Sequence, residues 1–329
     1  MTLAPVIIFN YNRLDHSRQT WEALSRNQYA AETELYLYCD GPKANASDEM
    51  RQHIAELHAQ AKQYAIDAPK EGKFKAVYVV CSEANKGLAN SIIGGVSEII
   101  AKHGRVIVLE DDLLTSPYFL KYMNTALDKY ERYPSVFTIS ANRPPVNKMF
   151  IPADYEYDVF VSLRPFSTGW ATWKDKWEKI DWSLDYLEEF LKHPEQIKAF
   201  NRGGDDLTNM LLLQRDHKID SWAIRYSFQL YYHHAVAILP CVPYVDNIGF
   251  DGTGIHSWND ETDFRNNVAL APENPCMPDV IYEDERIINA FANYYSRAKR
   301  PLWQRVINSI YRKIGKPAPF VIKKKIYNS

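Results

Sequence analysis

The sequence has little cysteine and no long apolar run. Its 329 residues include four cysteines, and no two of them form a Cys-x-x-Cys pair, which argues against a zinc finger and against a disulfide framework. Apolar runs such as Val6–Phe9 and Ala235–Leu239 are far shorter than the roughly 18 residues of a membrane span. The N-terminus has no basic leader followed by a cleavage site, so we expect no signal peptide and a cytoplasmic protein.

The glycine and histidine motifs of several enzyme classes are also absent. No Gly-x-Gly-x-x-Gly follows the first apolar run and no Gly-x-x-x-x-Gly-Lys-Ser/Thr occurs, which excludes the common dinucleotide-binding and P-loop folds. The sequence likewise has no Gly-x-Ser-x-Gly and no His-Glu-x-x-His, the signatures of many serine hydrolases and zinc proteases.

The charge is divided unevenly along the chain. Residues 286–329 contain eleven Lys or Arg and no acid, which leaves a net charge of −13 on residues 1–285. In 297–325 basic residues alternate with apolar ones at helical spacing. This pattern predicts a basic amphipathic helix on the anionic inner face of the plasma membrane, or else a helix packed on the body. The acidic body argues against a nucleic-acid partner.

Apolar runs and helix-period segments alternate in the first half of the chain. We expect strands at Val6–Phe9, Glu34–Cys39, Ala76–Cys81 and Val106–Leu109, and helices over about 15–26, 47–64 and 88–103. This alternation predicts an α/β fold with a doubly wound, mostly parallel sheet.

The second half is more irregular and predicts an elaboration of this sheet. We expect strands at 136–140 and 159–163, helices at 184–192 and 205–215, and a loop over 240–278. The chain would then divide into a sheet half (1–135), an elaborated half (136–285) and a basic tail (286–329).

Polar residues follow each of the first four predicted strands. They are Asn12 and Arg13, then Asp40, then Asn85 and Lys86, then Glu110, Asp111 and Asp112. Because the carboxyl ends of parallel strands meet at one edge, we expect these side chains to form a ligand site. Three consecutive acids after a buried strand need a compensating cation, and hard divalent cations prefer carboxylate oxygens. The alternative is that Asp112 or Thr115 caps a helix starting near Ser116 and Pro117.

Two features of the second half are further candidates for a site. Asp205 and Asp206 follow two glycines and precede an apolar helical segment, as a catalytic acid pair or a plain helix N-cap would. Trp170 is one of four tryptophans between 170 and 182. It could stack on a sugar ring, as indole faces do well, or belong to the core, whereas Trp173 and Trp177 are better explained as core.

The order of these segments resembles a known enzyme family. The first strand with Asn-x-Asn-Arg, the Cys-Asp-Gly after strand two, the Asn-Lys-Gly-Leu before a helix and the Val-Leu-Glu-Asp-Asp strand are similar to the GT-A nucleotide-sugar glycosyltransferases. The likeness is greatest to the N-acetylglucosaminyltransferase I type and to bacterial relatives of the family-two transferases. It is strong over residues 4–145 and weaker to about residue 256.

The resemblance implies a role for each candidate residue. Asp112 would bind Mn²⁺ or Mg²⁺ on the donor diphosphate, and Glu110 and Asp111 would contact the donor sugar, ribose or metal-bound water. Arg13 would lie at the nucleotide, Asp40 at the uracil edge, and Lys86 near the base or phosphates, with Asn12 and Asn85 beside them. Asp206, or its neighbour Asp205, would be the catalytic base, Trp170 would end an acceptor-side loop, and His256 would be a further metal or phosphate ligand.

We therefore expect a metal-dependent, inverting glycosyltransferase. It would move a sugar from a UDP-sugar to a carbohydrate or lipid-linked acceptor, as in bacterial surface polysaccharide synthesis. The alternatives are a sugar-phosphate nucleotidyltransferase, which would need a Gly-rich basic loop after the first strand, and a non-catalytic protein that binds nucleotide or carbohydrate.

Overall fold

One large sheet organises the protein. A computed structural model describes residues 2–250, 266–295 and 307. The strands are β1 (Val6–Asn10), β2 (Glu34–Cys39), β3 (Ala76–Cys81), β4 (Arg105–Glu110), β5 (Leu113–Thr115), β6 (Val136–Ser140), β7 (Val159–Ser162), β8 (Trp170–Trp173), β9 (Val236–Pro240) and β10 (Val245–Asn247). The α-helices are α1 (Leu14–Ser25), α2 (Asp48–Lys70), α3 (Leu88–His103), α4 (Phe119–Tyr130), α5 (Lys174–Trp177), α6 (Leu187–Phe190), α7 (Pro194–Phe200), α8 (Leu207–Arg215), α9 (Trp222–Tyr232) and α10 (Glu285–Tyr295).

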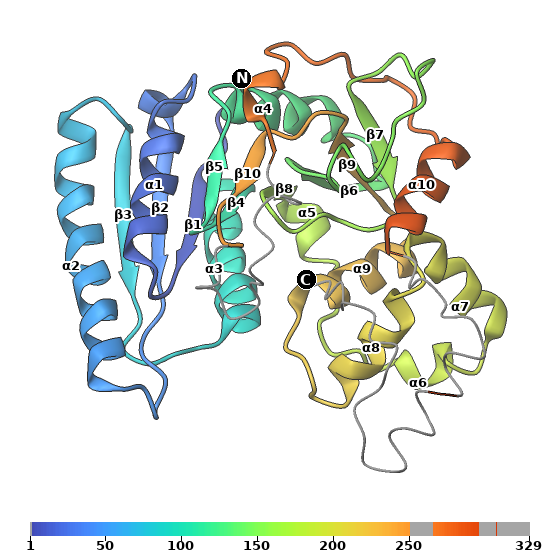
Figure 1. Ribbon diagram of the computed structural model, residues 1–329, viewed down its shortest axis with the longest axis horizontal. Helices are drawn as coiled ribbons and strands as arrows, with labels where there is room; N and C mark the ends of the chain where they lie inside the picture. Colours follow the sequence, from blue (N-terminus) through green and yellow to red (C-terminus); the bar gives the residue numbers. More distant parts are fainter. Residues whose placement is uncertain (1, 251–265, 296–306, 308–329) are drawn as a thin grey trace.

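The eight-stranded sheet has the order β3-β2-β1-β4-β8-β6-β9-β7. Strands β3, β2, β1 and β4 are parallel neighbours, β6 and β9 are also parallel, and β8 and β7 run antiparallel to their neighbours. A separate two-stranded sheet pairs β10 with β5. The predicted α/β class is confirmed, and β1, β2 and β3 end on the same side of the sheet, at the bottom in Figure 1.

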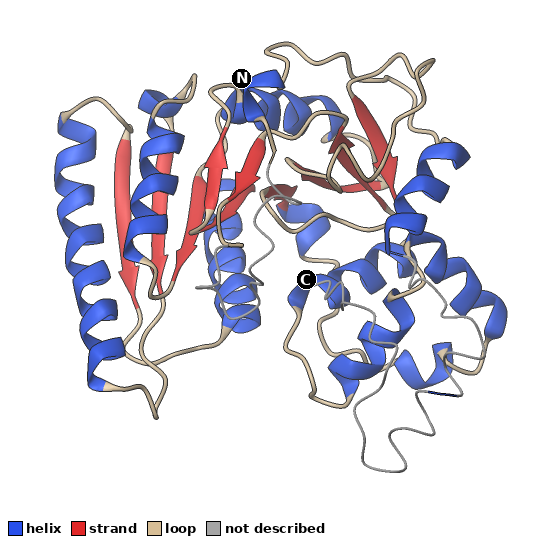
Figure 2. Ribbon diagram, viewed as in Figure 1, coloured by secondary structure: helices blue, strands red, loops and turns tan. Residues whose placement is uncertain are grey.

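Helices cover both faces of this sheet because the parallel strands are apolar on both sides. Along β1, Val6 and Ile8 belong to one core cluster, which α1, α2 and α4 complete, while Ile7 and Phe9 face a second cluster with α3 and α9. This two-residue alternation is that of a strand buried on both faces. A third, smaller core lies among α6, α7, α8 and α9, which form a group without strands in Figure 2.

Helix α3 illustrates how glycine fixes the geometry near the strand ends. It ends at Gly104, which has a φ of 78° and a backbone N–H that donates to the Ile100 carbonyl at 2.8 Å, a left-handed helix end of the kind that glycine favours. Inside the helix, a Cβ on Gly95 would lie 2.9 Å from the Phe9 ring of β1. The close approach of α3 to β1 therefore requires glycine at this position.

The second half departs from the prediction in three places. Trp170–Trp173 is a strand, β8, buried over its whole length between β4 and β6, and not a loop followed by a helix. The helix expected over 184–192 is the single turn α6, since Leu184 has a φ of 64°. Within the predicted loop 240–278, a short strand, β10, pairs with β5. The tail helix expected over 297–325 falls outside the described residues, apart from residue 307.

Candidate functional site

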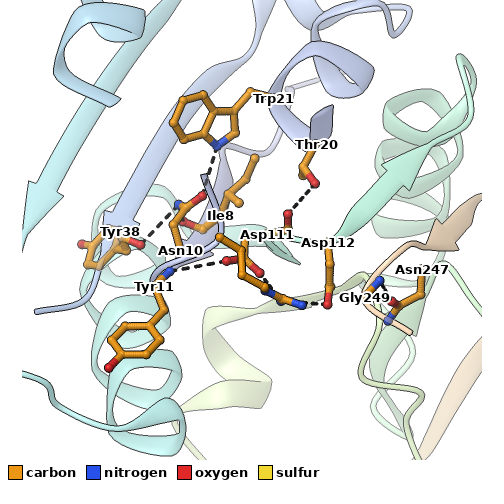
Figure 3. Close-up of polar contacts among 11 residues, drawn as sticks. Ile8, Asn10, Tyr11, Thr20, Trp21, Tyr38, Asp111, Asp112, Asn247 and Gly249 are labelled. Atoms are coloured by element: carbon orange, nitrogen blue, oxygen red, sulfur yellow. Dashed lines mark hydrogen bonds and ion pairs between the residues drawn. The ribbon is translucent and has the colours of Figure 1, made fainter. Parts of the chain in front are cut away.

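The acid triplet lies at the carboxyl end of β4, in the middle of the sheet. Glu110 is the last residue of β4, and Asp111 and Asp112 form the turn into β5. The backbone of this turn is fixed from two sides. The Thr20 hydroxyl donates to the Asp111 carbonyl at 2.9 Å (Figure 3), and the Ile248 N–H donates to the Asp112 carbonyl at 2.9 Å. Helix capping is the wrong explanation for Asp112, since β5 separates it from α4 and no side chain caps that helix.

Arg13 joins the carboxyl end of β1 to these acids. Its Nη2 donates to Asp112 Oδ2 at 2.8 Å and also contacts Asp111 Oδ1. The Tyr11 N–H donates to the other Asp111 oxygen at 3.4 Å. The contacts arise because β1 and β4 are parallel neighbours with Phe9 opposite Glu110.

The electrostatics show that one guanidinium does not fully compensate three acids. Burial, followed by the charges of Asp112 and Asp111, raises the pKa of Glu110 to about 8. Burial raises the pKa of Asp111 to about 6, although Arg13 opposes the shift. Burial alone would lower the pKa of Arg13, but the two aspartates outweigh it and raise that pKa. The raised pKa values of these two acids are what a buried site with excess negative charge produces.

Asp40 directly follows β2, at the carboxyl edge of the parallel strands. Its carboxylate accepts from the Gly41 N–H, the Asn85 amide and the Lys86 N–H at 2.9, 2.9 and 3.0 Å. The side chain therefore ties the end of β2 to the loop before α3. The Lys86 side chain is exposed, while the Asn12 amide turns toward α2 and donates to Met50 Sδ at 3.0 Å.

The two acids before α8, Asp205 and Asp206, differ in their exposure to solvent. Asp205 is exposed, whereas Asp206 is 3% exposed and accepts from Arg164 Nη1 at 2.9 Å and 3.1 Å. The Arg164 guanidinium also stacks on the Tyr295 ring of α10, 4.1 Å from its centroid. The plain N-cap explanation does not hold for Asp206, because its side chain makes no cap hydrogen bond to α8.

Trp170 is a core side chain, which corrects its expected place beside a sugar. It is 1% exposed, and its ring lies 4.8 Å from that of Trp222 and 5.6 Å from that of Trp177. Trp173 is equally buried, as expected for core. Trp170 and Trp173 serve packing because the whole of β8 is buried, which the spacing of the tryptophans alone did not reveal.

Asp112 is one residue that could hold a divalent cation. Within residues 2–250 and 266–295, no group of three or more His, Cys, Asp or Glu side chains is arranged to bind a metal, and His256 lies outside the described residues. The acids fit a hard cation in chemistry, since Asp112 presents carboxylate oxygens with 14% of its side chain exposed. A cation here would need further ligands from a bound molecule or water.

Two residues of the site were not singled out from the sequence. Arg164 is 42 positions from Asp206, so no local pattern joins them. A Cβ on Gly249 would lie 2.1 Å from Asp112 Oδ2 and 2.9 Å from Arg13 Nη1, which shows that the Gly249 backbone packs directly on this ion pair. The Gly249 N–H is itself held by Asn247 at 2.7 Å.

If the acid triplet binds UDP with Mn²⁺, as the resemblance implies, Gly249→Ala should weaken that binding about tenfold or more, because the methyl group would take the space of the Asp112 carboxylate. The atoms that must move are the ends of two side chains, so thermal stability should change little. The measurement is titration calorimetry. Gly94→Ala is the matched control, since a Cβ there meets no atom within 4 Å; wild-type affinity in Gly249→Ala would contradict this account.

Comparison with known proteins places the chain in a family. Residues 1–202 match the profile of the family described as the GNT-I family. An Alpha-1,3-mannosyl-glycoprotein 2-beta-N-acetylglucosaminyltransferase of Arabidopsis thaliana is 22% identical over 209 residues, which are 60% of this chain and 44% of that protein. The chain thus spans less than half the length of this curated relative.

Among solved structures, TarS of S. aureus is similar with a TM-score of 0.40 and 13% identity, over 74% of this chain and 36% of that one. The assignment does not depend on this structural likeness. It follows from the profile, which covers more than half of the chain and includes both Arg13 and the acid triplet. The chain therefore belongs to the GNT-I family, and its fold is of the GT-A glycosyltransferase type.

Proposed function

We propose that this glycosyltransferase is metal-dependent and inverting, and that it moves an N-acetylglucosamine-like sugar from a UDP-sugar to a carbohydrate acceptor. The observation that carries the proposal is the acid triplet of β4, paired with Arg13 at the shared edge of the parallel strands. Membership of the GNT-I family and the name of the Arabidopsis relative support the choice of sugar.

The donor half of the mechanism uses the strand ends. Arg13 has the planar fork that suits a diphosphate, and Asp40 holds the loop that carries Asn85 and Lys86 at the proposed nucleotide site. Asp112 would hold the divalent cation, which when bound neutralises the negative charge of the departing diphosphate. Glu110 and Asp111 would surround the donor sugar and ribose.

The acceptor half uses the acidic pair before α8. Asp206 would take the proton of the acceptor hydroxyl as that oxygen attacks the anomeric carbon, since inversion requires a base on the acceptor side. Arg164 contacts both Asp206 oxygens and fixes the direction of the carboxylate. Asp205, exposed at the same turn, is the second member of the pair.

The acceptor and the location of the enzyme stay predictions of the sequence. A lipid-linked acceptor, a role in bacterial surface polysaccharide synthesis and peripheral contact with an anionic membrane are supported by the eleven basic residues of 286–329. The segment 297–325 lies almost wholly outside the described residues. No helix in the described part of the chain has the length and apolar character to cross a bilayer.

A panel of nucleotide sugars tests the proposed function. With Mn²⁺ present, we expect UDP-N-acetylglucosamine to release its nucleoside diphosphate faster than GDP- and dTDP-sugars release theirs. EDTA should abolish this release. A sugar-phosphate nucleotidyltransferase, the rival, would need a Gly-rich basic loop after β1, which this sequence does not have. It would release pyrophosphate from a nucleoside triphosphate and a sugar phosphate instead. Binding of UDP and Mn²⁺ without any release, with or without added mono- and oligosaccharide acceptors, would identify a non-catalytic binding protein and overturn the proposal.

A further inference from the structure

Arg13 contacts two of the three acids that the proposed function assigns to the donor and the cation. Its guanidinium lies between Asp111 and Asp112, and the three side chains are 19%, 6% and 14% exposed. A guanidinium so placed is the internal counter-ion of a site that would otherwise hold adjacent, uncompensated carboxylates. The pair is supported from outside by the Gly249 backbone.

Arg13 and a metal ion cannot both bind the same oxygen of Asp112 without weakening each other's interaction with it. Arg13 Nη2 lies 2.8 Å from Asp112 Oδ2, and a divalent cation would bind a carboxylate oxygen at about 2.0–2.6 Å. Two positive groups on one carboxylate repel each other, so the metal must compete with Arg13 for Asp112. Among the residues described, no group of three metal-binding side chains exists, so these side chains by themselves offer a metal few ligands with which to displace Arg13.

A bound diphosphate would remove the competition. Arg13 stands at the start of α1, just after β1, with part of its side chain open to solvent, and phosphate oxygens are the partners that a guanidinium binds in bidentate fashion. If Arg13 moves to the diphosphate, Asp112 becomes available. The diphosphate then also supplies the oxygen ligands that the metal lacks.

We propose that Arg13 is a built-in counter-ion that holds Asp111 and Asp112 in the empty site and couples the entry of metal to the entry of nucleotide. The inference rests on the proposed function, since it takes the nucleotide diphosphate and the divalent cation as the ligands. Coupling is reciprocal: UDP strengthens Mn²⁺ binding by the same factor as Mn²⁺ strengthens UDP binding.

The test measures Mn²⁺ binding directly, by electron paramagnetic resonance of free Mn²⁺ and by calorimetry, with and without UDP. In the wild type we expect weak binding of Mn²⁺ alone and a gain of roughly 10- to 100-fold with UDP. Arg13→Gln should bind Mn²⁺ alone about tenfold more tightly than the wild type and should lose most of the gain from UDP. Arg18→Gln is the matched control, because Arg18 lies on α1, 59% exposed, and pairs only loosely with Asp15 at 3.8 Å.

Arg13→Lys covers the case in which Arg13→Gln does not fold. A lysine keeps the charge but cannot fork across two carboxylates, so Mn²⁺ alone should bind it more tightly than the wild type but less tightly than Arg13→Gln. Unchanged or weaker binding of Mn²⁺ alone in a folded Arg13 variant would overturn the inference while leaving the proposed function intact. If instead the wild type binds neither UDP nor Mn²⁺, the proposed function fails first.

Discussion

Asp112→Asn is expected to reduce metal-dependent sugar transfer about 100- to 1,000-fold, which corresponds to the several kcal/mol that a metal ion contributes to stabilising the leaving group. Asparagine keeps the shape of the side chain but removes the charge that would hold the cation. The fold should be unaffected, because Arg13 keeps its contact with Asp111 and the backbone bond from Ile248 to the Asp112 carbonyl does not involve the side chain.

The measurement is the initial rate of UDP release at saturating donor, with Mn²⁺ and with EDTA, accompanied by a thermal melt. Asp185→Asn is the matched control, since Asp185 is exposed and lies in the second half of the chain; its rate should equal that of the wild type. Full activity of the wild type in EDTA, or a normal rate in a folded Asp112→Asn variant, would show that Asp112 holds no metal needed for the reaction.

The sheet half of the fold could be predicted because its signals are local. Strands β2 and β3 and helix α3 occupy the predicted residues, since a short apolar run or a helical period with a glycine end specifies each one by itself. The convergence of the polar strand ends followed from parallel alternation alone, and the parallel order of β3, β2, β1 and β4 confirms that step.

The second half was less predictable because its structure depends on partners far along the chain. β8 reads as a Trp-rich loop until β4 and β6 are known to flank it. The contact of Arg13 with Asp111 spans 98 positions, yet it follows once β1 and β4 are neighbours, so it was in principle accessible. The pairing of Arg164 with Asp206 has no such route, because both residues lie in loops whose paths the sequence pattern leaves open.

Because Asp206 forms a buried ion pair with Arg164, a single substitution cannot separate a catalytic role of Asp206 from a structural one. Asp206→Asn leaves Arg164 buried without a counter-ion, and the side chains are 4% and 8% exposed, so the free energy of unfolding should fall by about 3–5 kcal/mol. Loss of transfer in this variant would therefore be ambiguous between a missing base and a disturbed structure.

The double variant Asp206→Asn with Arg164→Gln separates the two roles, because it removes both charges together and should recover much of the lost stability in chemical denaturation. We expect it to remain about 100- to 10,000-fold slower in transfer, the loss typical of a missing general base. Asp185→Asn is the matched control, at an exposed carboxylate that the proposed mechanism does not use. Asp205→Asn tests which acid of the pair is the base, and its transfer should stay within a few-fold of the wild type if the base is Asp206. Recovered transfer in the double variant would show that the pair of Asp206 and Arg164 is purely structural. A slow Asp205→Asn variant would assign the base to Asp205. Both conclusions hold because a carboxylate that removes a proton cannot do so once it is an amide, even in a correctly folded protein.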